Sequence, residues 1–517
     1  MLTEINAAKC IGIEAVPVTI EIDVSGGIGI HMVGLADAAV KESLLRTVTA
    51  LQGSGFRIPG KKIVINLAPA DMHKSGSGYD LPIAVGIIAA TEQMEFRGLG
   101  EFLIMGELGL DGSIRDVPGA LPIADYALSA GFRGMILPVR SALEVIEFEG
   151  LDIYGVERLE DVLRILTDGA GDLLIQNSAA YSEALSEERD HSGGPAVDFE
   201  DIIGQEGAKR GMEIASAGAH NVLLLGPPGS GKSSLAKAVP GILPPFTKEE
   251  AITASKIWSV AGKKAAGYGL MRARPFRSPH NSSSIPAMIG GGSGDNIVPG
   301  EVSLAQGGVL FLDEFCEAPK KTLEALRGPM EDRCVVISRL KAKIRYPASF
   351  MLIAASNPCP CGYFGEADRC TCTPGQRAAY LSRLSGPITD RLDLQIWMHP
   401  VETGKLVGRV KGESSAAVAE RVAAARRIQA ERFAGEGIFT NSEMSNAHIE
   451  RFCPLSEGCR KLMADLIEKM GLSARAYTRI IRIARTIADL EASPDILTRH
   501  LAEASLYRFL DRRDFYG

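Results

Sequence analysis

The sequence has no long apolar run. The longest, residues 81–90, is half of the roughly 20 residues that a helix needs to cross a bilayer, so we expect no membrane partner. The first residues hold no basic segment followed by an apolar one, and we therefore expect no secretory signal. The nine cysteines are an odd number and mostly scattered, which argues against a disulfide framework. These absences together favour a reducing, cytoplasmic location.

Positive charge is not in excess either. The chain has 56 lysines and arginines against 63 aspartates and glutamates, which gives a net charge of −7. Nothing in the overall composition requires a nucleic-acid partner, and any DNA-binding surface must be local. No long-period repeat is present. At 517 residues the chain is too long for one hydrophobic core, and we expect three domains.

Residues 1–170 predict a mixed α/β domain. β-branched residues alternate with other residues at 17–24 and at 61–68, as they do in strands. Between these two stretches, residues 35–55 have helical spacing and end on glycines, which favour helix C-termini.

The rest of the chain divides by composition and pattern. Residues 171–200 predict an acidic linker, since nine Asp or Glu residues and one Arg lie between 171 and 206. Over 201–400 strands alternate with helices, which is typical of a parallel sheet. Residues 401–517 predict an α-helical lid, with an amphipathic helix at 414–433. The predicted fold class is a multidomain α/β protein with a helical C-terminal domain.

A phosphate-binding loop is the strongest single signal. The stretch LLLGPPGSGKSS, residues 223–234, joins a buried strand to a loop that fits G-x-x-x-x-G-K-[ST]. Backbone N–H groups of such a loop surround phosphate oxygens, and the helix that follows adds its positive N-terminal end. Lys232 then reaches the terminal phosphates and Ser233 binds Mg²⁺, so we predict ATP with Mg²⁺. The expected nucleotide-binding residues are Gly226, Pro227, Pro228, Gly229, Ser230, Gly231, Lys232, Ser233 and Ser234.

Two further strands end in polar side chains. The stretch GGVLFLDEF ends in Asp313, expected to hold the Mg²⁺ shell, and Glu314, expected to orient the attacking water. The stretch SFMLIAASNP presents Asn357, whose amide can bridge that water and the γ-phosphate. Two acids at a strand end, or an Asn-Pro turn, are common on their own. Downstream of a phosphate-binding loop, they indicate an ATPase site.

Two arginines are candidates for stabilising the transition state. Arg391 lies at a helix–strand junction, where a guanidinium can reach the nucleotide of a neighbouring subunit; an Asp–Arg surface pair is the alternative. The predicted helix at 471–490 carries four arginines on one face, and Arg475 is our candidate for sensing the γ-phosphate. A solvated basic face is the other interpretation. The four are Arg475, Arg479, Arg482 and Arg485.

A basic stretch at 335–347 is the candidate DNA-binding surface. Its cations alternate with apolar residues, so they share one face of a strand or hairpin arm and can follow a phosphate backbone. An edge strand that uses lysine to prevent aggregation is the alternative. The candidate DNA contacts are Arg339, Lys341, Lys343 and Arg345. A second candidate loop, 272–292, carries Arg274, Arg277 and His280.

Four of the nine cysteines cluster in a C-x-C, eight-residue gap, C-x-C pattern. Four thiolates in two close pairs can form a tetrahedral zinc site, although C-x-C is tighter than the usual spacing. Packing thiols and a redox switch are the alternatives. A bound zinc would brace the loop that positions Arg391. The expected zinc ligands are Cys359, Cys361, Cys370 and Cys372.

The order of these motifs resembles a known family. GPPGSGKS, VLFLDE, ASNP, GPITDRLD and SARAYTRI follow one another as in the AAA+ ATPases of the magnesium-chelatase-like branch. Within that branch, nearly the whole chain resembles the bacterial ComM (YifB) family. The resemblance implies a ring, expected to be a hexamer, with ATP at the subunit interfaces. It also implies a DNA helicase that drives branch migration in homologous recombination and natural transformation.

The resemblance also implies how the candidate residues share the reaction. Lys232, Ser233, Asp313 and Glu314 would carry out hydrolysis within one subunit. Asn357 and Arg475 would sense the phosphate. Arg391 would act from the neighbouring subunit. In related helicases a hairpin just before the asparagine strand enters the pore of the ring, which matches the position of the basic stretch.

The N-terminal region resembles the proteolytic domain of Lon proteases, which uses a Ser–Lys dyad. In the matching stretch KSGSGYD the nucleophile position holds Gly78, and Leu121 stands where the lysine belongs. A hydroxyl without an adjacent base is a poor nucleophile. We therefore expect an inactive Lon-like domain used for assembly or DNA contact, although Ser77 with Lys74 or Lys61 stays open.

Two other functions are consistent with an AAA+ core. The first is the ATPase subunit of a metal chelatase, but the chain lacks the D-x-S-x-S metal site of the partner subunit in such systems. The second is a protein-remodelling or proteolytic machine, which would favour an aromatic pore loop and an intact Ser–Lys pair. The basic stretch and the missing dyad favour the DNA motor over both.

Overall fold

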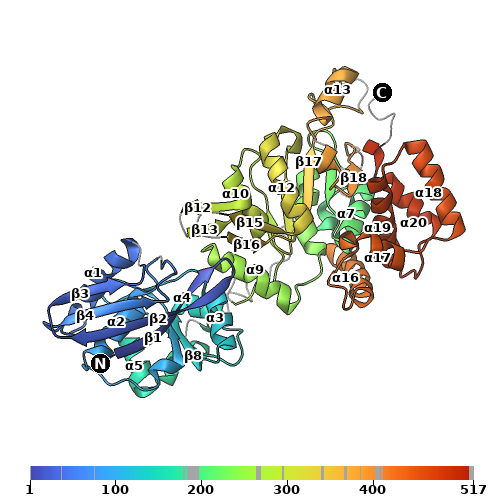
Figure 1. The fold of residues 1–517 in the computed structure, drawn as a ribbon. Coiled ribbons are helices and arrows are strands. Elements are labelled where there is room, and N and C mark those ends of the chain that lie inside the picture. The colour runs from blue at the N-terminus through green and yellow to red at the C-terminus, as the bar shows by residue number, and fades with distance from the viewer. Residues whose placement is uncertain are drawn as a thin grey trace.

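The structure is a computed structural model, and it shows an N-terminal body in blue beside a larger body in green to red (Figure 1). Three hydrophobic clusters form the cores: one in the N-terminal body and two in the larger one. The described residues are 2–35, 38–74, 76–178, 181–182, 197–263, 269–293, 296–338, 343–365, 369–384, 386–401, 404, 408 and 411–511.

A seven-stranded mixed sheet forms the N-terminal body, in the order β3-β4-β2-β1-β5-β8-β9. The strands expected at 17–24 and 61–68 are β2 and β4, which pair antiparallel, and the helix expected at 35–55 is α1. The strands of this sheet are β1 Leu2–Ile11, β2 Glu14–Ser25, β3 Gly29–Val33, β4 Lys62–Ala68, β5 Phe102–Ile104, β8 Gly134–Pro138 and β9 Asp152–Val156. Strands β6 Glu107–Leu108 and β7 Ile114–Arg115 form a separate antiparallel pair. The helices are α1 Ala38–Gly53, α2 Asp80–Ala90, α3 Ala120–Ser129, α4 Val139–Glu144 and α5 Leu159–Asp168.

A five-stranded parallel sheet forms the centre of the larger body, in the order β11-β14-β17-β10-β18. Its inner strands are buried along their whole length, which explains their continuous apolar runs. The strands are β10 Val222–Leu225, β11 Phe276–Arg277, β14 Val309–Leu312, β17 Met351–Ser356 and β18 Leu394–Trp397. The helices are α7 Glu206–Gly218, α8 Lys232–Ala238, α9 Lys248–Val260, α10 Ile285–Ile289, α11 Glu301–Leu304, α12 Lys320–Asp332, α13 Pro374–Leu381 and α14 Gly386–Thr389.

Two β-hairpins leave this core. They are β12 Gly290–Ser293 with β13 Asn296–Pro299, and β15 Cys334–Ser338 with β16 Lys343–Pro347. The Tyr346 hydroxyl donates to the Ile297 carbonyl oxygen at 2.7 Å and so joins the two hairpins.

The C-terminal region is helical, as predicted, and no strand occurs among residues 411–511. It packs on α7 and shares one hydrophobic cluster with the five-stranded sheet, to which Met212, Leu224 and Ile480 belong. The helices are α16 Ser415–Arg432, α17 Asn446–Phe452, α18 Glu457–Met470, α19 Ala474–Leu490 and α20 Thr498–Leu506. Within the described part of the chain, no helix is both long enough and apolar enough to span a bilayer.

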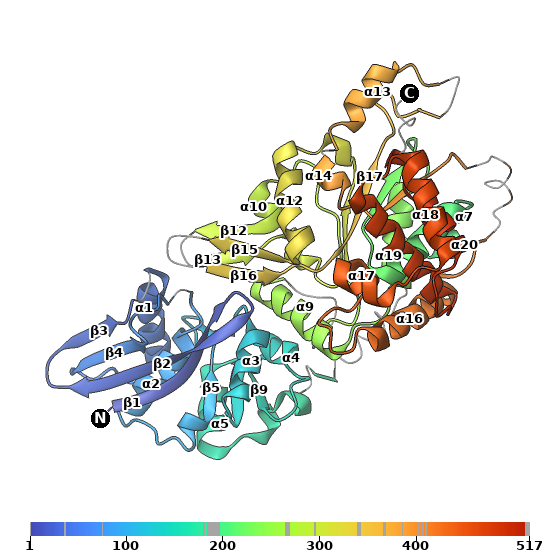
Figure 2. The same ribbon diagram turned by 45° about the vertical axis from the view of Figure 1, so that its right-hand side comes forward.

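The two bodies meet along α9 and the hairpins (Figure 2). The backbone N–H of Gly119, just before α3, donates to the Ser259 carbonyl oxygen of α9 at 3.1 Å. Lys256 of α9 forms an ion pair with Asp125 of α3 at 2.6 Å. The predicted domain limits at 170, 200 and 400 stay predictions, and residues 179–180 and 183–196 of the predicted acidic linker lie outside the described residues.

Candidate functional site

The phosphate-binding loop follows β10 and leads into α8. Gly229 and Gly231 have φ values of +78° and +89°, a region that only glycine adopts readily. The Lys232 ammonium donates to the carbonyl oxygens of Gly226 and Pro227 at 2.7 and 2.9 Å. Burial lowers the pKa of Lys232, and the charge of Asp313 acts in the opposite direction. The lysine is thus held across the loop, where it can meet phosphate oxygens.

The structure brings the predicted magnesium ligands together. Ser233 Oγ at the start of α8 donates to Asp313 Oδ2 at the end of β14, at 2.8 Å. A hydroxyl and a carboxylate oxygen at this distance fit the oxygen ligands that Mg²⁺ prefers. Asn357 follows β17, and its Oδ1 lies 3.4 Å from the Lys232 nitrogen. The carboxyl ends of parallel strands share one edge of the sheet, which is why these side chains meet.

Glu314 has a partner that the sequence motifs did not indicate. Its backbone is left-handed, with φ +49°, and its carboxylate accepts a hydrogen bond from Asn281 Nδ2 at 2.8 Å. Asn281 lies in the loop between β11 and α10, 33 residues upstream. The only sequence signal for it is the polar stretch SPHNSSS, which by itself indicates a loop.

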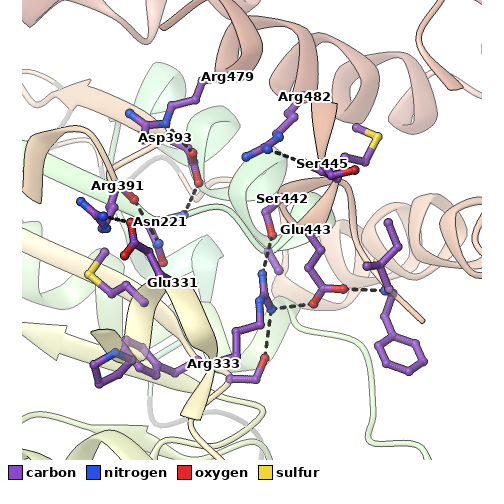
Figure 3. A pocket seen from close by; sticks show the side chains of 18 of the residues that line it. Asn221, Glu331, Arg333, Arg391, Asp393, Ser442, Glu443, Ser445, Arg479 and Arg482 are labelled. Atoms are coloured by element: carbon purple, nitrogen blue, oxygen red, sulfur yellow. Dashed lines mark hydrogen bonds and ion pairs between the residues drawn. The ribbon is translucent and has the colours of Figure 1, made fainter. Parts of the chain in front are cut away.

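Arg391 and Arg475 lie together in a pocket away from the phosphate-binding loop. Both line a pocket of about 630 Å³, shown from close by in Figure 3, whose lining does not include Lys232, Ser233 or Asp313. Arg391 forms an ion pair with Glu331 of α12. Arg475 forms an ion pair with Asp390, in which the arginine side chain is 68% exposed. The finger candidate and the sensor candidate therefore share a site that is separate from the phosphate-binding loop.

The other arginines of α19 do not form a solvated basic face. Arg479 pairs with Asp393 at 3.3 Å, and Arg485 is buried against Asp489 at 3.1 Å. Burial lowers the pKa of Arg479 and Arg485. Burial also acts to raise the pKa of Asp393, but His220, whose Nδ1 lies 3.6 Å away, and the nearby arginines outweigh it, so this pKa lies well below its usual range.

The basic hairpin is described only in part. On β16, Lys343 and Arg345 are exposed while Ile344 and Tyr346 are buried, which confirms the alternation for this arm. Arg339 and Lys341, the two other predicted DNA contacts, lie outside the described residues. The buried face of β16 meets the N-terminal body, since a Cβ atom added at Gly12 would lie 2.9 Å from Ile344 Cγ2.

The second candidate loop offers fewer free cations than its sequence suggests. Arg274 pairs with Glu250 at 2.9 Å and stacks over the Phe246 ring. Arg277 forms two hydrogen bonds to the Glu301 carboxylate. Both guanidinium groups are therefore already paired with glutamates of the same body.

The N-terminal body does not assemble a Ser–Lys dyad from these candidates. Ser77 Oγ donates to the Glu107 carboxylate, whereas Lys74 is buried and donates to the Pro69 carbonyl oxygen. Burial lowers the pKa of Lys74. Leu121 is also buried, and its backbone N–H lies 3.5 Å from Ser259 Oγ. Helix α9 of the ATPase core thus covers the position where the Lon family carries its lysine.

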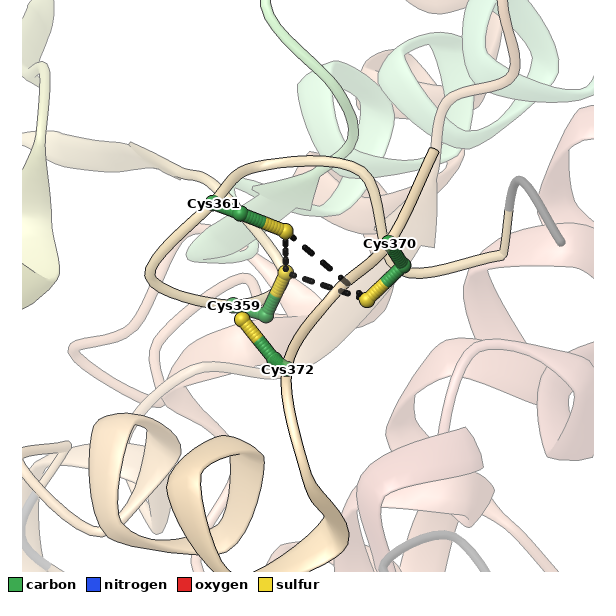
Figure 4. Close-up of side chains that lie close together, drawn as sticks. All are labelled: Cys359, Cys361, Cys370 and Cys372. Carbon is green, nitrogen blue, oxygen red and sulfur yellow. Dashed lines mark hydrogen bonds between the residues drawn. The ribbon is translucent and has the colours of Figure 1, made fainter. Parts of the chain in front are cut away.

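The four clustered cysteines point to a common centre (Figure 4), and all four sulfurs lie within 4.8 Å of one another. Cys359 Sγ lies 3.3 Å from Cys361 Sγ and 3.9 Å from Cys370 Sγ. Four thiolates at the usual Zn–S distance would be about 3.8 Å apart, so the set fits a tetrahedral zinc ion. Hydrogen bonding from the backbone of Tyr363 lowers the pKa of Cys361 to about 6, whereas burial raises that of Cys359 to about 12. Cys372 completes the set.

Three family models match the chain. Residues 198–406 match the model described as magnesium chelatase, subunit ChlI, and residues 412–508 match the model of its C-terminal part. Residues 20–141 match a third model, described as subunit ChlI of Mg-chelatase. The matches cover the three structural regions that the sequence patterns indicated.

Similar proteins cover almost the whole length. YifB of Salmonella typhimurium is 42% identical over 515 residues, which are 99% of this chain and 98% of that protein. The competence protein ComM of Haemophilus influenzae is 42% identical over 513 residues, with the same coverage. The archaeal Lon protease of Methanocaldococcus jannaschii is 26% identical over 152 residues, which are 29% of this chain and 23% of that protein.

The arrangement of Lys232, Ser233 and Asp313 at one edge of a parallel sheet is that of an ATPase, and a helical region follows it in the chain. The family models and the full-length relatives agree with this arrangement. The chain therefore belongs to the YifB/ComM family of magnesium-chelatase-like AAA+ ATPases, with an N-terminal region that resembles the Lon protease domain.

Proposed function

We propose that this protein is an ATP-driven DNA motor that assembles as a ring and moves branched DNA in homologous recombination and natural transformation. The observation that carries the proposal is an exposed cationic arm, β16, in the same body as the phosphate-binding loop and the Ser233–Asp313 pair. The name of the relative ComM, a competence protein, supports a role in DNA uptake.

Hydrolysis uses groups that already lie near one another. Lys232 binds the terminal phosphates, and Ser233 with Asp313 holds Mg²⁺, which supplies charge stabilisation to the phosphoryl group. Glu314 orients the attacking water once its carboxylate leaves Asn281. Asn357 contacts the water and the γ-phosphate from the neighbouring strand. The Asn281 contact keeps Glu314 from the water until the loop before α10 moves.

Arg391 and Arg475 act together on the nucleotide of a neighbouring subunit. Their common pocket supports this assignment, because residues that serve one phosphate group must lie within reach of one another. Glu331 and Asp390 hold the two guanidinium groups in the free subunit, and a phosphate replaces these carboxylates when the ring closes. Hydrolysis is therefore completed only in the oligomer, which we propose to be a hexamer.

The β15–β16 hairpin contacts DNA. Lys343 and Arg345 face solvent on one side of β16, at the spacing of alternate strand residues. The opposite side, through Ile344, rests on the turn of the N-terminal body at Gly12. The Lon-like body then acts as a support for the hairpin. Contacts of this kind bind phosphates without reading the base sequence.

The four cysteines hold one zinc ion. The sulfurs of Cys359, Cys361 and Cys370 lie 3.3–3.9 Å apart, which suits a Zn–S₄ tetrahedron and exceeds the length of a disulfide bond, and all four sulfurs lie within 4.8 Å of one another. Zinc analysis of the purified, untagged protein is expected to find one ion per chain. A metal-free protein that binds ATP normally would contradict this assignment.

Branch migration on a labelled four-way junction tests the DNA motor. We expect the wild type to move strands with ATP and Lys232→Ala to move none. Replacement of Lys343 and Arg345 by alanine is expected to weaken DNA binding and to reduce the dependence of binding on salt, because about two phosphate contacts are lost. Lys461→Ala, at an exposed position of α18, is the matched control. ATP hydrolysis that persists without strand movement and ignores added DNA would contradict the proposal.

A metal-chelatase ATPase is the second candidate, because all three matching family models are named for that enzyme. It predicts ATP hydrolysis that DNA does not stimulate. A proteolytic machine is a weaker alternative, since Ser77 bonds to Glu107 rather than to a lysine. Casein that stays intact after incubation with the protein and ATP would exclude it.

A further inference from the structure

The loop that carries the cysteines lies directly on the phosphate-binding loop. A Cβ atom added at Gly362 would lie 2.9 Å from Pro228 Cδ, 3.1 Å from Pro228 Cγ and 3.8 Å from Asn357 Cγ. Gly362 itself has a φ of +86°, and its N–H donates to the Cys359 carbonyl oxygen at 3.0 Å. The backbone between two of the metal-ligand candidates therefore touches a residue that surrounds the nucleotide.

The first cysteine lies close in the chain to Asn357, the sensor candidate. Cys359 is fully buried two residues after Asn357, at the end of the central strand β17. Asn357 Oδ1 in turn accepts from Lys232 at 3.4 Å. A shift of Cys359 would move Asn357 and with it a contact of the phosphate-binding lysine.

An aromatic contact holds the other side of the loop. The rings of Phe364 and Trp397 meet edge to face with centroids 6.0 Å apart, and a Cβ atom at Gly365 would lie 3.3 Å from the Trp397 ring. Trp397 ends β18 and pairs with Leu225, the residue that precedes the phosphate-binding loop. The cysteine loop thus lies between Pro228 on one side and Trp397 on the other.

The described part of this loop has no regular secondary structure, although Arg369 stacks on the Tyr363 ring and Arg377 on the Phe364 ring. Residues 359–365 and 369–372 form turns and extended chain without a helix or strand. Four metal–sulfur bonds would join the two halves of the loop at one point (Figure 4). Without them, the contacts of Gly362 and Phe364 would depend on a short segment without backbone pairing.

We infer that the zinc site positions the nucleotide site: metal bound by the four cysteines holds Gly362 against Pro228 and fixes Asn357, so ATP binds tightly only to the metal-loaded subunit. This inference rests on the proposed zinc site. It makes the cysteines positioning residues for the ATPase, which act through Pro228 and Asn357. It does not depend on the proposed DNA activity.

The test combines metal removal with two measurements that need no hydrolysis. Trp258 and Trp397 are the two tryptophans of the chain, so Trp258→Phe leaves Trp397 as a fluorescence reporter beside the loop. A zinc-selective chelator is added to this protein, zinc release is followed with a colorimetric dye, and ADP affinity is measured by calorimetry. We expect a red shift of Trp397 emission and roughly tenfold weaker ADP binding, as for the loss of one hydrogen bond to a charged group. Added zinc should restore both.

A double variant checks that the cysteines are responsible. Replacement of Cys370 and Cys372 by serine should reproduce the effects of the chelator. Cys10→Ser is the matched control, because this thiol lies in the N-terminal body and donates to the Gly119 carbonyl oxygen, which a serine hydroxyl can also do. The reversible chelator experiment on the Trp258→Phe protein keeps the test valid if the double variant does not fold.

The possible results distinguish three claims: that zinc positions the nucleotide site, that the cysteines bind zinc, and that the protein moves DNA. Zinc that is present, and whose removal leaves ADP affinity and Trp397 emission unchanged, would overturn the inference and leave the zinc site standing. A protein that contains no zinc, yet binds ADP tightly, would overturn both. A protein that responds to zinc as expected but moves no DNA supports the inference and contradicts the DNA motor alone.

Discussion

Asp393 joins the helical lid to the ATPase sheet, and Asp393→Ala tests that joint. The carboxylate accepts from the backbone N–H of Asn221 at 3.1 Å and pairs with Arg479 of α19 at 3.3 Å. It also lies 3.6 Å from His220 Nδ1. Both members of the Asp393–Arg479 pair are 11% exposed. One buried carboxylate thus connects the start of β10, the start of β18 and the lid.

The expected loss is large because alanine leaves a buried charge behind. Arg479 Nη1 has no hydrogen-bond partner among the described residues. The buried positive charge of Arg479 is therefore stabilised mainly by the ion pair with Asp393. Removal of one partner from a buried ion pair typically costs about 3–5 kcal/mol of unfolding free energy. We expect a loss in this range, measured by urea denaturation followed by circular dichroism.

Asp390→Ala is the matched control, three residues away. Its partner Arg475 is 68% exposed, and exposed pairs contribute up to about 1 kcal/mol. Equal losses from the two variants would refute the reasoning, since they would mean that burial of the Asp393 pair does not determine its contribution.

The lowered pKa of Asp393 also predicts how the difference in unfolding free energy between wild type and Asp393→Ala depends on pH. A carboxylate whose folded pKa lies below its unfolded value of about 3.9 contributes its full stabilisation above that pH. The contribution is lost as the pH falls toward the folded pKa. The difference between wild type and Asp393→Ala should therefore stay constant from about pH 5 to 8 and shrink only in stronger acid.

Two predictions concern the ATPase reaction itself. Glu314→Gln should bind ATP and DNA but hydrolyse nothing and move no strands, because an amide cannot activate the attacking water; strand movement at the wild-type rate would rule out its role. Arg391→Ala and Arg475→Ala should each lower hydrolysis by about 10³-fold or more in uniform rings. Mixed with Lys232→Ala subunits, each should regain activity, since some interfaces then combine an intact Lys232 in one subunit with intact arginines in its neighbour. If Arg475→Ala regains none while Arg391→Ala does, Arg475 acts within its own subunit.

The loop geometry of the candidate phosphate-binding residues could be predicted from the sequence because it is local. Gly229, Gly231, Lys232 and Ser233 lie in one loop, and the glycine positions require backbone angles that other residues avoid. The meeting of this loop with Asp313 was also predictable, because the carboxyl ends of the parallel strands in one sheet share an edge, although β17 lies between β10 and β14. The cysteine cluster follows from short spacing in the same way.

Contacts between elements that are far apart in the chain could not be predicted from the sequence in this way. Asn281 reaches Glu314 across 33 residues, and nothing in its surroundings distinguishes it from other loop asparagines. The arginines of α19 share a face by helical spacing, but spacing cannot say whether that face meets water or Asp393. For the same reason, the sequence suggested that Arg475 contacts the phosphate but did not indicate that Arg475 lies beside Arg391.

The sequence alone determined the order of the three regions, several of the strands and helices that build them, and the candidate residues for phosphate and Mg²⁺, because strong periodicity and short motifs specify these locally. Only the tertiary structure decided that Arg391 and Arg475 share a pocket, that α9 covers Leu121, and that Gly362 rests on Pro228. These contacts join segments far apart in the chain. Their formation depends on how whole elements pack, and no local pattern of residues encodes it.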